Sequence, residues 1–77
     1  YKSVYETGST ESPDREYTAR SFMYENAGDS YTVFVRLTDK KSGREKNIYQ
    51  EEQKNLDVRM KWMSNGIIQI NGRRIRI

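Results

Sequence analysis

Two Asn-Gly dipeptides near the C-terminal end constrain this chain more than any other feature. They are Asn65-Gly66 and Asn71-Gly72, and apolar residues alternate with polar ones on both sides of each. Asn-Gly between alternating apolar residues is the strongest short-range signal for a β-hairpin, because both residues tolerate the left-handed backbone of a tight turn. The sequence therefore predicts two consecutive hairpins, that is, three antiparallel strands within residues 58–77.

The spacing of the apolar residues also predicts how these three strands pair. A two-residue turn at Asn65-Gly66 would put Trp62 and Ile68 on opposite faces, because a shift of one residue flips every side chain. A three-residue loop that ends at a left-handed Gly66 places Trp62 opposite Ile68 instead, and the second turn then pairs Ile68 with Ile75. We expect Trp62 to be largely buried at the centre of the resulting inner face. That apolar face consists of Val58, Met60, Trp62, Ile68, Ile70, Ile75 and Ile77.

The opposite face of the same strands is basic. From residue 54 onward, six Lys and Arg residues stand against a single acid, which gives this end a net charge of +5, whereas the whole chain has +3. On the predicted register, four of the six project from one side of the sheet, namely Arg59, Lys61, Arg74 and Arg76. A patch of this kind suits an anionic partner, either an anionic membrane surface or a cell-wall polymer, and less readily a nucleic acid. The alternative is a solvated strand face that has no partner.

The segments before residue 54 predict further strands. Residues 31–38 alternate well and are rich in β-branched and aromatic residues, and residues 17–24 and 46–50 form weaker strands on either side. Residues 51–55 are too few and too polar for a stable helix, so we expect a loop there. Residues 1–11 are polar and show no sustained periodicity, which predicts a flexible lead-in.

These segments together predict the fold class. We expect one all-β domain over residues 12–77, with five to six antiparallel strands in a meander that forms a bent sheet or a partly closed small barrel. With 77 residues, the chain has room for one hydrophobic core at most. We expect a monomer.

The composition excludes several kinds of chemistry. The chain has no Cys and no His, which removes Ser-His-Asp and Cys-His catalysis, thiolate ligands and His-rich metal sites. The adjacent carboxylates Glu51 and Glu52 are expected to be solvated loop acids, not a catalytic pair. We therefore predict no catalytic residue, no metal and no cofactor, and thus a protein that is not an enzyme.

Aromatic residues suggest a second surface. Phe22 and Phe34 lie on strand faces that are otherwise polar, so they either form an exposed recognition surface or contribute to a second core. Exposed aromatic rings beside a basic face can stack with the bases of single-stranded nucleic acid. A small nucleic-acid-binding β-barrel that uses the basic C-terminal strands is therefore the alternative function.

Several short motifs are similar to those of a known family. They are Ser12-Pro13-Asp14, Tyr17-Thr18-Ala19, Lys41-Ser42-Gly43-Arg44, Asn47-Ile48-Tyr49, Val58-x-Met60-Lys61-Trp62 and Ile68-x-Ile70-Asn71-Gly72. Over residues 12–77 the chain resembles a small uncharacterised family of membrane-associated proteins of Gram-positive bacteria. The resemblance implies a compact, non-enzymatic β-domain on the extracytoplasmic side of the cell membrane, and it carries over no catalytic residue. No apolar stretch approaches the roughly 18 residues that cross a bilayer, so the implied anchor would lie upstream of this chain.

Overall fold

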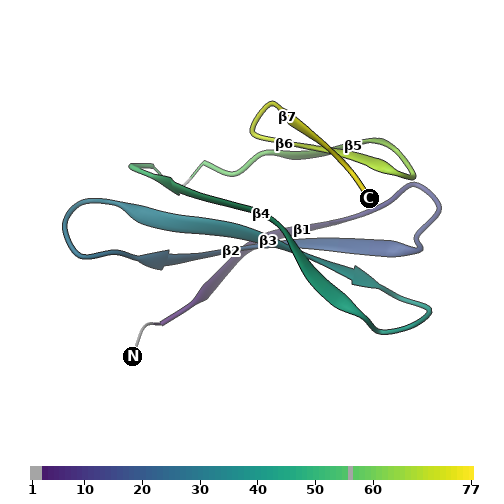
Figure 1. Cartoon of the computed structure of the whole chain (residues 1–77), viewed down its shortest axis with the longest axis horizontal. Helices are drawn as coiled ribbons and strands as arrows, with labels where there is room; N and C mark the ends of the chain where they lie inside the picture. Colours follow the sequence, from purple (N-terminus) through teal and green to yellow (C-terminus); the bar gives the residue numbers. More distant parts are fainter. Residues whose placement is uncertain (1–2, 56) are drawn as a thin grey trace.

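The computed structural model describes residues 3–55 and 57–77. All helical or extended secondary structure in these residues is β-strand (Figure 1). The strands are β1 (Tyr5–Glu11), β2 (Tyr17–Glu25), β3 (Tyr31–Asp39), β4 (Glu45–Gln53), β5 (Met60–Ser64), β6 (Ile67–Ile70) and β7 (Arg73–Arg76). They form a large antiparallel sheet in the order β1-β2-β3-β4 and a small one in the order β5-β6-β7. The all-β class is confirmed, but the described residues form seven strands in two sheets and no closed barrel.

Strand β1 lies in the segment that the sequence predicts as a flexible lead-in. Residues 5–11 pair with β2 on both sides of an irregularity at Thr7, and the hydroxyl groups of Thr7 and Ser21 form a hydrogen bond of 2.7 Å. The sequence gives no sign of this strand because both of its faces are polar and most of it is exposed. Pairing with β2, not apolar alternation, makes it a strand. Residues 1–2 of the expected lead-in lie outside the described residues.

Strand β4 is longer than the sequence predicts. It continues through Gln53, because residues 51–53 pair with residues 31–33 of β3. The prediction of a loop at residues 51–55 is therefore wrong for residues 51–53, which belong to β4. Their charged and amide side chains carry no strand pattern, so the long partner β3 decides how far β4 extends.

The Ser-Pro-Asp turn joins β1 to β2 through hydrogen bonds of its own side chains. Ser12 is only 2% exposed, yet its hydroxyl donates to Oδ1 of Asp14 at 2.7 Å and accepts the Tyr17 backbone N–H at 3.1 Å. These bonds satisfy a buried polar group and fix the turn. The same turn contacts the small sheet, since the Asp14 N–H donates to Oδ1 of Asn65 at 2.9 Å.

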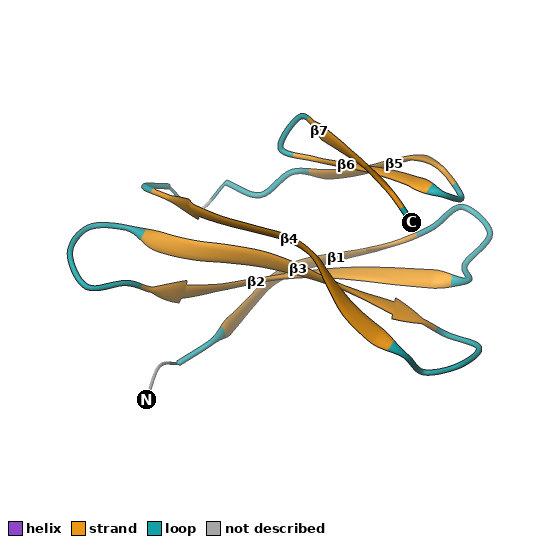
Figure 2. Ribbon diagram, viewed as in Figure 1, coloured by secondary structure: helices purple, strands orange, loops and turns teal. Residues whose placement is uncertain are grey.

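The core lies between the two sheets, which pack face to face (Figure 2). Alternation along β3 turns Val35 and Leu37 toward the small sheet, and β6 supplies two side chains that are fully buried. The buried cluster consists of Ala19, Val35, Leu37, Tyr49, Ile68 and Ile70. The other members of the predicted inner face of the small sheet surround it as half-buried side chains.

The predicted register of the small sheet is confirmed. Trp62 lies opposite Ile68, and Ile68 lies opposite Ile75. The mechanism differs from the prediction, because Gly66 is not among the glycines with positive φ. A β-bulge at Met63 between Trp62 and Ser64 supplies the one-residue shift that the left-handed glycine was expected to provide.

The second turn has the predicted conformation. The φ angles of Asn71 and Gly72 are 48° and 85°, both positive as a type I′ turn requires. Trp62, by contrast, is half-buried and not largely buried, because β5 is an edge strand of the small sheet. Its indole Nε1 reaches the Thr10 carbonyl oxygen at 3.5 Å and so links β5 to β1.

Candidate anion-binding surface

The structure places the four predicted cations on the outer face of the small sheet, away from the core. Lys61 and Arg74 lie on either side of Gln69 in the strand register, so the two like charges are not adjacent. Arg76 is two residues beyond Arg74 on β7, and Arg59 is two residues before Lys61. All four side chains are exposed. We call these four residues, Arg59, Lys61, Arg74 and Arg76, the basic surface.

The nearby Arg73 behaves differently from the basic surface. Alternation turns it toward β4, where its guanidinium lies 3.6 Å from a carboxylate oxygen of Glu51 and 5.7 Å from the ring centre of Tyr49. No ion pair with another described residue is found for any member of the basic surface. The charge of Arg73 is thus used within the fold, whereas the other four charges face solvent.

A shallow hollow of about 470 Å³ opens on this face and is lined by Arg59, Lys61, Gln69, Asn71 and Gly72. Its rim is held in place by the Asn71 side chain, whose Oδ1 accepts the Arg59 backbone N–H at 2.8 Å. The Asn71 Nδ2 also contacts the Tyr49 hydroxyl at 3.4 Å, which links the turn to the large sheet. Two cations and the amide of Gln69 therefore surround a preformed depression that can accept an anionic group.

A family of unknown function, DUF5412, matches residues 5–77. The chain belongs to this family. No curated protein and no solved structure matches it. The matched region begins at the first residue of β1 and includes all seven strands, so residues 5–11 of the expected lead-in fall within the DUF5412 domain. No helix in the described part of the chain has the length and apolar character needed to cross a bilayer.

The acidic residues of the DUF5412 domain are dispersed over its surface. The hydroxyl of Ser12 and the backbone N–H of Glu16 bind Asp14 and lower the pKa of its carboxyl group. The side chain of Lys40 lowers the pKa of the Glu11 carboxyl group through a hydrogen bond and through its positive charge. In residues 3–55 and 57–77, no group of three or more acidic side chains could hold a metal ion.

The adjacent carboxylates Glu51 and Glu52 do not form a pair in the structure. Because they are consecutive in β4, they project to opposite faces of the large sheet. Glu51 contacts Arg73 on the inner face, and Glu52 accepts a hydrogen bond of 3.2 Å from the Asn26 amide. Each of the two carboxylates therefore contacts a different side chain on its own face of the sheet.

Phe22 and Phe34 form a cluster on the outer face of the large sheet. Their ring centres are 5.2 Å apart, and the rings are nearly parallel at 19°. The Arg36 guanidinium lies 5.6 Å from the first ring centre and 5.8 Å from the second. The sequence singles out both rings, but it could not show that they stack, because their contact depends on the register in which β2 pairs with β3. The cluster and the basic surface are on opposite sides of the molecule, with both sheets between them.

Proposed function

We propose that this DUF5412 domain is a non-enzymatic module that rests on an anionic membrane through its basic surface. In this proposal it belongs to a membrane-associated bacterial protein and lies on the extracytoplasmic side, held by an anchor upstream of this chain. The observation that carries the proposal is the set of four exposed cations without an ion-pair partner among the described residues. Strand alternation turns polar side chains of this sheet outward, but it does not require four cations and no acid among them, and Arg73 shows that the fold can pair an arginine of this sheet with an acid.

The geometry of the basic surface suits a planar partner. The four cations project from one face of a short three-stranded sheet, so an extended anionic surface can contact all of them at once. Each Lys or Arg close to an anionic bilayer contributes about 1 kcal/mol. Four of them give about 4 kcal/mol, which is roughly a thousandfold increase in binding. The attraction depends on salt, because charges are screened beyond about 8 Å at physiological ionic strength.

Nucleic-acid binding is supported less well by this arrangement. Single-strand binders combine cations with aromatic platforms on the same surface. Here the Phe22–Phe34 stack lies across the molecule from the basic surface, and Trp62 packs toward the core. A strand of nucleic acid on the basic surface would therefore meet charge without stacking partners.

Co-sedimentation with lipid vesicles tests the proposal. We expect the domain to pellet with phosphatidylglycerol vesicles at low salt and to remain in solution with phosphatidylcholine vesicles. The charge reversal Lys61→Glu/Arg74→Glu should abolish pelleting. A matched control, Arg20→Glu/Lys54→Glu, changes the net charge equally but alters exposed residues outside the basic surface, and it should still pellet.

The other outcomes each have a defined meaning. If both double variants lose binding equally, net charge alone drives the interaction and the proposed surface is wrong. If the domain pellets only with an isolated anionic wall polymer, the partner is that polymer and not the bilayer. Binding to oligonucleotides alone would support the alternative function, and binding to nothing would make the basic surface an ordinary solvated face.

A further inference from the structure

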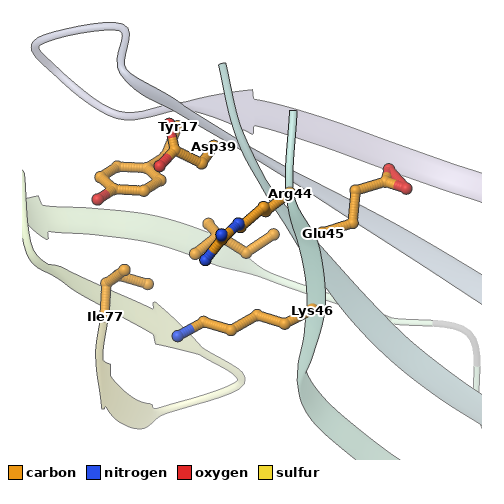
Figure 3. A pocket seen from close by; sticks show the side chains of 7 residues that line it. Tyr17, Asp39, Arg44, Glu45, Lys46 and Ile77 are labelled. Atoms are coloured by element: carbon orange, nitrogen blue, oxygen red, sulfur yellow. The ribbon is translucent and has the colours of Figure 1, made fainter. Parts of the chain in front are cut away.

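A separate cleft of about 390 Å³ opens between the two sheets, at the end of the molecule where β4 begins (Figure 3). Small-molecule sites in proteins commonly have volumes of about 300–1,000 Å³. The large sheet and the β3–β4 loop supply most of its walls, and the residue after β7 supplies the rest. The lining side chains that matter here are Tyr17, Leu37, Asp39, Arg44, Lys46 and Ile77.

Strand alternation gives this cleft its charge. Arg44, Glu45 and Lys46 are consecutive, so the two cations share one side of the chain and the carboxylate takes the other. Figure 3 shows the ends of Arg44 and Lys46 directed toward Tyr17 and Ile77, while Glu45 points away. The Glu45 carboxylate instead accepts a hydrogen bond of 3.3 Å from the Thr38 hydroxyl.

The two cations of the cleft lack partners within the described chain. Neither Arg44 nor Lys46 forms an ion pair or a side-chain hydrogen bond with a described residue. Two acids also line the cleft, but Glu45 points away from it, and the Oδ1 of Asp39 already accepts the Lys41 backbone N–H at 3.0 Å. The cleft therefore has two cations that no ion pair within the described residues neutralises.

The remaining walls are apolar or aromatic. Leu37 is 2% exposed and belongs to the core, and the half-buried side chains of Tyr17 and Ile77 flank it. Charged and apolar walls therefore meet in one space. A simple inorganic anion would contact only the cations, whereas a neutral apolar molecule would leave them unused.

We propose that this cleft binds a small organic anion with an apolar body. Its carboxylate, sulfonate or phosphate group is held by Arg44 and Lys46, and its apolar part lies against Tyr17, Leu37 and Ile77. The site is independent of the basic surface, which lies on the other face of the small sheet.

Binding of the fluorescent probe anilinonaphthalene sulfonate tests this assignment. We expect the sulfonate probe to bind, and its uncharged counterpart phenylnaphthylamine to bind at least about tenfold more weakly. The variant Arg44→Gln/Lys46→Gln should weaken sulfonate binding by about tenfold. The matched variant Lys61→Gln/Arg74→Gln removes the same charge from the basic surface and should leave the affinity within about twofold of the parent.

Two further measurements make the result decisive. All four substituted residues are exposed, so both variants should melt like the parent in circular dichroism, which excludes unfolding as the cause of any loss. In a two-dimensional NMR titration, the probe should shift the backbone amides of residues 37–39 and 44–46. The proposal is overturned if the two double variants bind equally, if the uncharged probe binds as tightly, or if the shifted amides lie elsewhere.

Discussion

Ile68 lies at the centre of the contact between the two sheets, and its replacement by Ala tests the packing directly. Its side chain has no exposed surface and belongs to the cluster that includes Val35 and Leu37. Truncating a fully buried Ile to Ala costs about 2–5 kcal/mol, and the central position predicts about 3–4 kcal/mol here. A domain of this size has a total stability of only about 4–12 kcal/mol. We therefore expect Ile68→Ala to lower the melting temperature by at least about 12 °C.

The neighbouring Ile67 provides a matched control within the same strand. It is the same residue type, but alternation places it on the outer face, where it is half-buried opposite Arg76. Ile67→Ala should cost about 1 kcal/mol or less, chiefly through reduced β-propensity. The measurement is urea unfolding followed by fluorescence of Trp62, the only tryptophan, together with far-UV circular dichroism as a test of two-state behaviour. If Ile67→Ala destabilises as much as Ile68→Ala, the register and the face-to-face packing are both wrong.

Two other predictions concern a turn and the effect of pH. Gly72→Ala should destabilise the domain by about 1–2 kcal/mol in thermal melts, because the φ angle of Gly72 is +85°. Gly66→Ala should be nearly neutral, because Gly66 does not have a positive φ angle. Equal effects of the two substitutions would contradict the two turn conformations. The pKa values of Glu11 and Asp14 are lowered from their ordinary values of 4.5 and 3.8, respectively. Each carboxylate therefore stabilises the fold at pH values above its ordinary pKa, and this stabilisation is lost as the pH falls through the lowered pKa. NMR titration should give both carboxyls pKa values below those ordinary ones, and values at or above them would refute the two local contacts.

Much of the C-terminal region could be predicted from the sequence because the interactions that define it are local. The turn at Asn71-Gly72, the alternation of the flanking strands and the pairing of Ile68 with Ile75 all lie within a short segment. The same alternation places Lys61 and Arg74 on the outer face. Hairpin geometry needs no information from the rest of the chain.

The first Asn-Gly turn shows where this local reasoning ends. Its register could be predicted, but its backbone conformation could not. The side chain of Asn65 accepts a hydrogen bond from Asp14, 51 residues earlier, and the bulge at Met63 makes a left-handed Gly66 unnecessary. An interaction between two distant turns leaves no local signal in the sequence.

Turn chemistry and alternation act over a few residues. The all-β class, the two C-terminal hairpins and the separation of apolar from basic side chains could therefore be predicted from the residues alone. Contacts between distant segments make β1 a strand, extend β4 to Gln53 and divide the strands into two sheets. The physical reason is that β1 and the end of β4 depend on neighbouring strands for their hydrogen bonds. Each sheet also has one apolar face, and both faces leave water only if the sheets pack against each other. That packing creates the cleft, where Arg44 and Lys46 meet Ile77 although some 30 residues separate them along the chain.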